Sequence, residues 1–287
     1  MRHRTDKERD SQKSVDSKAE VEAFLETVAQ ASQSLLMLDF DGTLAPFHMD
    51  RRKAFPYPGI TPVLQEILEL ENTRVVIVSG RDAIELIPLL AVNPHPEVWG
   101  LHGLQRVKTD GSMEVSALDE STLKALAAAD DWLVSQQLEH AAEFKAGSIA
   151  VHWRGVHEPE AQEIHRRVML GWAEIAQQSE LDLLQFDGGV EIRSKQANKG
   201  AAVRALIGEM NPDVPAAYLG DDITDEDAFQ AINGLGLSIL VRPLWRPTAA
   251  QLWLRPPDEL LDLLTRWLDA CREPHESGAE STAAVNS

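Results

Sequence analysis

The chain has 287 residues, enough to bury one large hydrophobic core or two medium ones. Its formal net charge of -19 repels nucleic-acid backbones and anionic membranes, so neither is an expected partner, and an anionic substrate would need local positive charge from a metal ion or placed cations. Its one cysteine, Cys271, excludes a disulfide within the chain, and without an apolar leader or a membrane-length apolar run the sequence predicts a soluble cytoplasmic protein.

The first third of the chain alternates amphipathic helical patterns with short, continuous apolar runs. Such runs are typical of strands that are buried on both faces of a sheet. After a polar arm over 1–18, which we expect to be disordered, we predict helices over 17–31, 61–70 and 82–90 and strands over 34–40, 74–78 and 97–99.

The last third repeats this alternation, whereas the middle differs from both. Helices over 201–210 and 258–270 and strands over 216–219 and 237–241 continue an α/β domain with a mostly parallel sheet. Between them, helices over 118–138 and 158–178 and hairpins over 143–154 and 181–193 indicate a small inserted α+β unit. We therefore expect a core over 19–104 and 194–271, an inserted cap over 105–193, and a disordered tail over 272–287.

Polar side chains follow several strands of the predicted parallel sheet. In such sheets ligands bind beyond the carboxyl ends of the strands. The residues at these ends are Asp39 and Asp41, then Ser79, then the turn 100–103, and then Asp221 and Asp222. Together they predict a site of carboxylates around a hydroxyl group.

Asp39 and Asp41 can share one cavity if the chain turns between them, and Gly42 gives the freedom for that turn. A carboxylate can attack a phosphorus centre that is held in line by a cation and form an acyl phosphate. The second carboxyl group can then protonate the leaving oxygen and later activate water. An aspartate that caps the next helix is the plain alternative for either residue alone.

The segment 220–227 contains five acidic residues, which repel one another unless a cation lies among them. A calcium-binding EF-hand loop is excluded because Ile223 and Glu226 stand at its third and sixth positions. Carboxylate ligands with room for waters and phosphate suit Mg²⁺ better. The end of the run, from Asp225, is equally consistent with an acidic helix N-terminus.

Two further residues fit a phosphate site. Ser79 and the adjacent Gly80 precede a helix, so the hydroxyl and the backbone amides can hold phosphate oxygens, although a plain N-cap explains Ser79 equally well. Lys199 can offset the carboxylates and hold the phosphoryl group. A lone lysine is usually a solvated surface group, so only its combination with the other segments is informative.

In order and content these segments resemble the haloacid-dehalogenase superfamily of phosphatases: DFDGT at 39–43, Ser79, Lys199, and GDDITDE at 220–226. The resemblance implies a Rossmannoid parallel-sheet core with an inserted α+β cap of the C2 type. It also implies that Asp39 is the nucleophile and Asp41 the general acid and base. Asp39, the Asp41 carbonyl and Asp221 would hold Mg²⁺, assisted by Asp222 or Asp225, while Ser79, Gly80 and Lys199 would hold the phosphoryl group.

Within that superfamily the chain resembles the trehalose-6-phosphate phosphatases, through the segments 78–81, 100–103, 143–145, 152–154, 190–193 and 220–229. Two departures are Trp153, where the family usually has Tyr, and Ser194, where it often has Pro. The resemblance implies hydrolysis of trehalose 6-phosphate, with sugar contacts from His102, Glu143, Lys145, Arg154, Glu191 and Arg193.

Two rival interpretations remain open at this point. One is a phosphatase of the same mechanism acting on another sugar phosphate, such as glucosylglycerate phosphate or sucrose phosphate. The other is a signalling or scaffold domain in which a phosphorylated aspartate biases a conformation without turnover; Asp41 and the inserted cap argue against it. The sequence carries no feature that assigns or excludes a trehalose-phosphate synthase as a partner.

Overall fold

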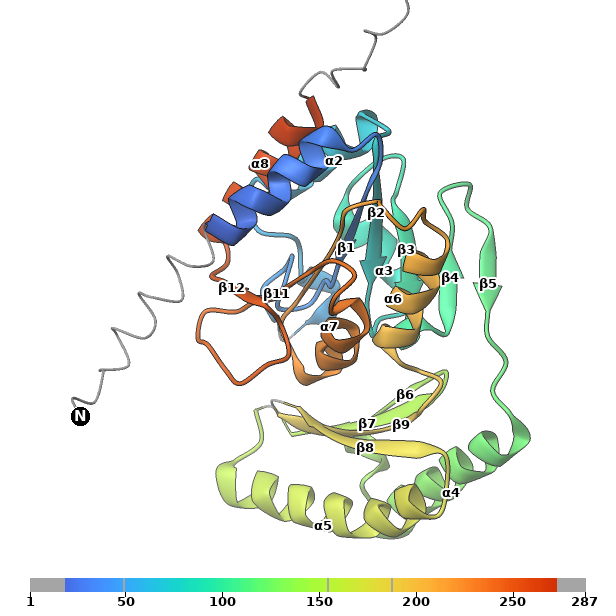
Figure 1. Ribbon diagram of the computed structural model, residues 1–287. Helices are drawn as coiled ribbons and strands as arrows, with labels where there is room; N and C mark the ends of the chain where they lie inside the picture. The colour runs from blue at the N-terminus through green and yellow to red at the C-terminus, as the bar shows by residue number, and fades with distance from the viewer. Residues whose placement is uncertain (1–18, 49, 154, 187, 273–287) are drawn as a thin grey trace, which may run out of the picture.

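The computed structural model describes residues 19–48, 50–153, 155–186 and 188–272 (Figure 1). The N-terminal arm over 1–18 and the tail after Arg272, both predicted to be disordered, lie outside the described residues. Within these ranges no helix combines the length and the hydropathy that crossing a bilayer requires.

The larger of two sheets has eight strands and forms the centre of the core (Figure 1). Six strands are parallel, and the two at one edge are antiparallel. In spatial order they are β12 (Leu252–Leu254), β11 (Leu237–Val241), β10 (Ala216–Gly220), β1 (Ser34–Leu38), β2 (Thr73–Val78), β3 (Glu97–Gly100), β4 (Gln105–Val107) and β5 (Met113–Val115).

Helices cover both faces of this sheet, which explains why its central strands are continuously apolar. Alternate residues of β1 enter different hydrophobic clusters: Leu36 and Leu38 face one set of helices, and Leu35 and Met37 face the other. The first set is the helix over 19–30 with α2 (Ile60–Glu69), α3 (Ala83–Leu90) and α8 (Asp258–Arg272); the second is α6 (Lys199–Gly208) and α7 (Glu226–Ile232).

Three short strands, β4 and the two edge strands β5 and β12, were not predicted from the sequence. β5 is exposed along its length and β12 has three residues, so neither shows a usable burial pattern. β4 and β5 belong to the large sheet, which therefore continues beyond residue 105, where the inserted unit was expected to begin. We propose that the inserted unit comprises the elements from α4 to β9.

The second sheet lies below the core and belongs to the predicted cap (Figure 1). Its antiparallel strands, in spatial order, are β6 (Ala142–Lys145), β7 (Ser148–His152), β9 (Gly189–Ser194) and β8 (Leu181–Phe186). Two helices, α4 (Glu120–Gln136) and α5 (Glu158–Gln177), pack on one face, and the short helix η3 (Glu139–Ala141) leads into β6. The predicted parallel α/β core with an inserted α+β unit is confirmed.

The two faces of the cap sheet differ in chemistry because side chains alternate along each strand. Ile149, Val151, Val190 and Ile192 pack with α4 and α5 in a separate hydrophobic cluster. The charged residues of β6 and β9 therefore lie on the other face, which is turned toward the core (Figure 1).

Candidate active site

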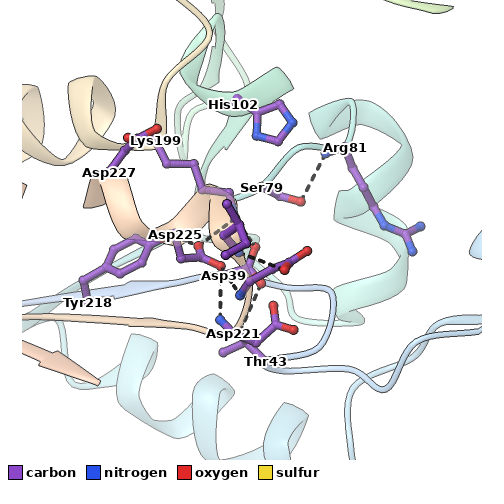
Figure 2. A network of polar contacts seen from close by, with 12 residues as sticks. Asp39, Thr43, Ser79, Arg81, His102, Lys199, Tyr218, Asp221, Asp225 and Asp227 are labelled. Atoms are coloured by element: carbon purple, nitrogen blue, oxygen red, sulfur yellow. Dashed lines mark hydrogen bonds and ion pairs between the residues drawn. The ribbon is translucent and has the colours of Figure 1, made fainter. Parts of the chain in front are cut away.

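The carboxyl ends of three adjacent parallel strands bring the predicted catalytic residues together. Leu38, the last residue of β1, is aligned with Ile77 of β2 and with Leu219 of β10. The residues that follow these strand ends include Asp39, Ser79 and Asp221, whose side chains gather in one network in Figure 2. The position of this site follows from the parallel topology.

Asp39 is buried at the centre of the network, with 3% of its surface exposed. Its Oδ1 accepts a hydrogen bond of 2.7 Å from Lys199 Nζ, and its Oδ2 accepts one of 3.0 Å from the Thr43 hydroxyl. Burial raises the pKa of Asp39 to about 7, with further increases from Asp225 and Asp41, and Lys199 acts against them. A carboxylate held this way has a fixed direction and is poorly solvated, as a nucleophile requires.

Lys199 is a buried cation that joins two carboxylates. Its Nζ lies 2.7 Å from Asp39 Oδ1 and 2.8 Å from Asp225 Oδ1. Although burial acts to lower the pKa of Lys199, the two carboxylates raise it above its usual value, so the group stays charged. Asn198 caps the helix that begins at Lys199 and so fixes where this side chain starts.

Asp225 orients the site rather than facing the cavity. Its Oδ1 accepts hydrogen bonds from Lys199 and, at 2.6 Å, from the Tyr218 hydroxyl. Its Oδ2 accepts the backbone amides of Asp221 and Asp222, at 3.1 and 2.9 Å. These contacts hold the acidic loop against Lys199.

The carboxylate cluster fits a divalent cation. Oxygen atoms of Asp39, Asp221 and Asp225 lie within 4.8 Å of one another, and all three residues are buried. Burial, followed by the charges of Asp39, Asp225 and Asp222, raises the pKa of Asp221 well above its usual value. Lys199 alone therefore does not neutralise the charge of the three carboxylates. Their oxygen atoms are ligands that suit a hard cation such as Mg²⁺.

Gly42 makes the close approach of two chain segments possible. Its φ is +86°, and a Cβ atom at this position would lie 2.1 Å from Asp221 Oδ2. The backbone turn after Asp41 and the packing of Asp221 against it therefore both require glycine.

We expect Gly42→Ala to destabilise the protein by about 1–3 kcal/mol, because the left-handed backbone becomes strained and Asp221 must move. Urea unfolding monitored by circular dichroism measures this loss. Gly111→Ala is the matched control, since it has φ +80° and no atom within 4 Å of the added Cβ. A Gly42→Ala loss no larger than the Gly111→Ala loss would show that Asp221 does not constrain this turn.

Ser79, Gly80 and His102 form a second wall. The Ser79 hydroxyl accepts the Arg81 amide at 3.2 Å, and a Cβ on Gly80 would lie 2.5 Å from the His102 ring. Leu101 and His102 both have left-handed backbone conformations, with φ 52° and 55°. This uncommon backbone, in the short helix η2 (Leu101–Gly103), places the buried imidazole directly over Gly80.

The core-facing side of the cap sheet carries a row of charged side chains. Glu143 and Glu191 are each aligned with Ala150 of the strand between them, so they lie on the same face. Glu191 Oε1 accepts the Ser148 hydroxyl at 2.7 Å and lies 3.5 Å from Lys145 Nζ.

Glu191 also faces the core, where its Oε2 lies 3.5 Å from His102 Nε2. Burial acts to raise the pKa of Glu191, but His102, Lys145 and Ser148 together bring it well below its usual value. Burial lowers the pKa of His102 itself. The Glu191 carboxylate is therefore an ionised acceptor between cap and core.

Core and cap residues together line an open cavity of about 150 Å³. Its walls include eleven predicted site residues: Asp39, Asp41, Ser79, Gly80, His102, Glu143, Lys145, Glu191, Lys199, Asp221 and Asp222. A wider groove on the side of Trp153 and Arg242 shares Phe186 and Asp222 with this cavity. The sequence thus predicted most of the cavity wall.

Two predicted residues that the structure describes, Asp225 and Arg193, are not among those that line the cavity. Asp225 lies behind Lys199, and Arg193 is buried and donates to Asp227 Oδ2 at 2.6 Å, which joins the cap to α7. Arg154 lies outside the described residues.

Sequence reasoning also missed residues that do line the cavity, among them Phe47, His48, Arg51 and Arg81. The run 51–53 (RRK), which is basic in an acidic chain, was an available signal.

A family model described as trehalose-phosphatase matches residues 37–254, which is more than half of the chain. The chain belongs to the trehalose-phosphatase family. This confirms the family resemblance found in the sequence. The matched range includes every predicted site residue.

Relatives in this family cover most of the chain. A trehalose-phosphate phosphatase of Mycobacterium leprae is 30% identical over 260 residues, which are 82% of this chain and 58% of the relative. A trehalose-6-phosphate phosphatase of Escherichia coli is 26% identical over 219 residues, 75% of this chain and 79% of the relative. The chain therefore spans less than two thirds of the M. leprae protein.

Solved structures show the same fold. The C-terminal domain of Candida albicans trehalose-6-phosphate phosphatase matches with a TM-score of 0.74 at 21% identity, covering 87% of this chain and 96% of that one. A haloacid dehalogenase-like hydrolase from Bacteroides thetaiotaomicron matches with a TM-score of 0.61 at 13% identity, covering 82% and 99%. The fold of this trehalose-phosphatase family member is thus haloacid-dehalogenase-like, as predicted.

The two departures from the family pattern have local explanations. The backbone amide of Ser194 donates to Gly147 O at 2.8 Å, a bond that the Pro usual at this position cannot make. Trp153 packs against His165 with ring centroids 5.2 Å apart and lines the outer groove rather than the cavity around Asp39. Neither departure alters the wall that carries Asp39.

Proposed function

We propose that this chain hydrolyses trehalose 6-phosphate to trehalose and phosphate through an aspartyl-phosphate on Asp39. The observation that carries the proposal is the position of Asp39. It is buried beside Lys199 at the strand end where the family match begins, and it opens into a cavity whose far wall is the charged face of the cap. The single cysteine and the acidic charge suit a cytoplasmic enzyme with a small sugar phosphate as its partner.

The first step transfers the phosphoryl group to the enzyme. A carboxylate oxygen of Asp39 attacks phosphorus, the bond from phosphorus to the sugar oxygen breaks, and Asp41 gives its proton to that oxygen. Lys199, the Ser79 hydroxyl and the backbone amide of Gly80 stabilise the charge on the phosphoryl oxygens. Trehalose is the first product.

The second step frees the enzyme. Asp41, now ionised, takes a proton from a water molecule as the water oxygen attacks phosphorus, and the bond between phosphorus and the Asp39 oxygen breaks. Inorganic phosphate leaves, and Asp39 and Asp41 return to their starting protonation states.

The donor set favours Mg²⁺ as the cofactor. Asp39, Asp221 and the Asp41 carbonyl would hold the ion, assisted by Asp222, whose carboxylate also lines the cavity. When bound, the ion neutralises charge on the transferring phosphoryl group. Asp225 would then fix the loop that carries Asp221.

The charged face of the cap suits a sugar chemically, but the cavity is too small for a disaccharide phosphate unless part of the protein moves. Carboxylate and ammonium groups on rigid strands, such as Glu143, Lys145 and Glu191, accept from and donate to sugar hydroxyls. A cavity of about 150 Å³ is smaller than the ~300–1,000 Å³ usual for ligand sites. A disaccharide phosphate must therefore extend past Phe186 into the outer groove or be admitted by opening of the cap.

A substrate panel with Mg²⁺ tests the specificity. We expect trehalose 6-phosphate to be hydrolysed faster than sucrose phosphate and glucosylglycerate phosphate. If it is hydrolysed no faster than these, the substrate assignment is wrong and the rival sugar phosphatase is favoured. A phosphoprotein that forms without turnover would favour the signalling or scaffold domain. The likeness to a Candida albicans trehalose synthase regulatory protein, with a TM-score of 0.65 at 13% identity, makes this second outcome worth measuring.

We expect Glu191→Gln to raise the KM for trehalose 6-phosphate about 10- to 100-fold, because an ionised hydrogen-bond acceptor contributes about 1.5–3 kcal/mol. The kcat/KM for 4-nitrophenyl phosphate, which has no sugar, should change less than about threefold. Glu180→Gln is the matched control, because Glu180 pairs only with Lys195 among its described contacts and is largely exposed. Equal losses of kcat/KM with both substrates would show that Glu191 does not bind the sugar.

A further inference from the structure

We propose, on the basis of the function above, that Arg81 is a positioning residue for Asp41. It holds the Asp41 carboxylate at rest. The same arginine is tied to the cap through Arg51, so that engagement of the sugar and release of the acid are coupled.

Arg81 forms a bidentate ion pair with Asp41. Its Nε donates to Asp41 Oδ2 and its Nη2 donates to Asp41 Oδ1, each at 2.6 Å. The Arg81 side chain is buried, with 4% exposed, and its guanidinium lies 5.5 Å from the centre of the Phe40 ring. A buried, paired guanidinium fork has one preferred geometry, so it fixes the direction of the carboxylate.

This grip has a consequence for catalysis. Both Asp41 oxygens accept hydrogen bonds from Arg81, so Asp41 is a carboxylate in this arrangement. To act as the general acid, it must release at least one of the two bonds and take a proton from water at the released oxygen, and it then gives that proton to the sugar oxygen. The arrangement is therefore the resting position of Asp41. Without Arg81, the Asp41 side chain, which is 27% exposed, would lose the ion pair that fixes its direction.

The remaining donor of Arg81 leads toward the cap. Its Nη1 donates to the backbone carbonyl of Arg51 at 2.6 Å, in the short helix η1 (Arg51–Lys53). The Arg51 side chain forms an ion pair with Glu143 on the charged face of the cap. One continuous chain of contacts therefore runs from the cap to Asp41.

Glu143 is also a proposed sugar ligand, so sugar hydroxyls compete with Arg51 for its carboxylate. When the sugar takes Glu143, η1 loses its tie to the cap, and the carbonyl that anchors Arg81 is free to shift. A shift there loosens the grip on Asp41 at the moment when the substrate is in place. The coupling thus links Glu143, the proposed sugar ligand, to Asp41, the proposed general acid.

The test compares leaving groups, because 4-nitrophenolate departs without needing a proton whereas a sugar alkoxide does. We expect Arg81→Lys to lower kcat for trehalose 6-phosphate about 10- to 100-fold, part of the 10²–10⁴-fold usual for general acid catalysis. The rate of 4-nitrophenol release in the first turnover should change less than about threefold. In an Asp41→Asn background, Arg81→Lys should have less than about a twofold further effect on trehalose 6-phosphate.

Equal slowing of both substrates, or a loss that adds to that of Asp41→Asn, would overturn the positioning role. Arg81→Lys keeps a cation at the buried position, and Arg81→Gln serves as the second variant if the lysine variant does not fold. Thermal melting of each variant identifies a loss caused by unfolding.

A substitution in η1 tests the ion pair between Arg51 and Glu143 of the cap. We expect Arg51→Gln to lower kcat for trehalose 6-phosphate about threefold to tenfold, because without the ion pair to Glu143 the carbonyl that anchors Arg81 is no longer fixed and Asp41 loses its defined direction before the sugar binds. The substitution should spare 4-nitrophenol release. Arg52→Gln is the matched control, because this neighbour has a side chain that is 90% exposed and pairs with Asp50. Identical kinetics for the two variants would overturn the coupling.

The wild-type enzyme separates failure of this inference from failure of the proposed function. If wild type hydrolyses another sugar phosphate instead of trehalose 6-phosphate, the same comparison is made with that substrate. If wild type releases no phosphate from any monoester, the proposed function fails and this inference fails with it. If wild type turns over but Arg81→Lys matches it on both substrates, only this inference fails.

Discussion

Asp39→Asn is expected to lower turnover of trehalose 6-phosphate at least about 10⁴-fold, because a neutral amide cannot form the acyl phosphate. The substitution keeps the size of the side chain and can keep the contacts with Lys199 and Thr43 in altered form. The protein should therefore remain folded. Phosphate release under steady-state conditions measures the loss, and circular dichroism checks the fold.

Asp213→Asn is the matched control, because Asp213 is exposed in the loop before β10, far along the chain from the strand end that carries Asp39. It should keep wild-type activity. Substantial turnover by Asp39→Asn would exclude Asp39 as the nucleophile. Mass spectrometry of wild type quenched in acid during turnover should detect phosphate on the peptide that contains Asp39, and its absence from the Asp39→Asn variant completes the comparison.

The parallel core could be predicted because its strands are buried on both faces. Helices cover both faces of the sheet, so the sequences of its central strands are continuous apolar runs, as in β1, β2, β10 and β11. The strands β4, β5 and β12 could not be predicted, because three residues are too few to show a burial period. Their place in the sheet is decided by pairing with distant segments.

The centre of the site was equally predictable, since topology alone brings the ends of β1, β2 and β10 together. The contacts between core and cap were not. Arg193 stands two residues from Glu191 on the same strand face, yet it pairs with Asp227 at the joint between the two sheets. Arg81 and Arg51 acquire their roles only through partners 40 and 92 residues away, Asp41 and Glu143. No local pattern encodes such a partnership.

Asp221→Asn is expected to have opposite effects on activity and on the stability of the metal-free protein. Activity should fall on the order of 10³-fold, because a proposed metal ligand becomes neutral. The melting temperature of the metal-free protein should rise by roughly 2–4 °C, which corresponds to about 1 kcal/mol in a protein of this size. Calorimetry after treatment with a chelator, with and without added Mg²⁺, measures the second effect.

The rise in stability follows from electrostatics. Burial and the charges of Asp39, Asp225 and Asp222 raise the pKa of Asp221 well above its usual 3.8, so the folded state binds the Asp221 proton more tightly than the unfolded state does. Ionisation of Asp221 therefore destabilises the metal-free fold increasingly as pH rises above 3.8, and the neutral amide removes that penalty. The difference in stability between variant and wild type should accordingly widen as the pH rises above 3.8.

Added Mg²⁺ should reverse the order. A ligand that binds only the folded state at 100 times its dissociation constant adds about 2.7 kcal/mol, and wild type should gain this while Asp221→Asn gains far less. Asp213→Asn, whose side chain is exposed, should follow wild type under both conditions. If metal-free Asp221→Asn melts below wild type, or if Mg²⁺ stabilises both equally, then Asp221 is a structural acid and the cation lies elsewhere. If Asp221→Asn is inactive but melts above wild type in the absence of metal, the Asp221 carboxylate destabilises the metal-free fold and serves to bind the cation.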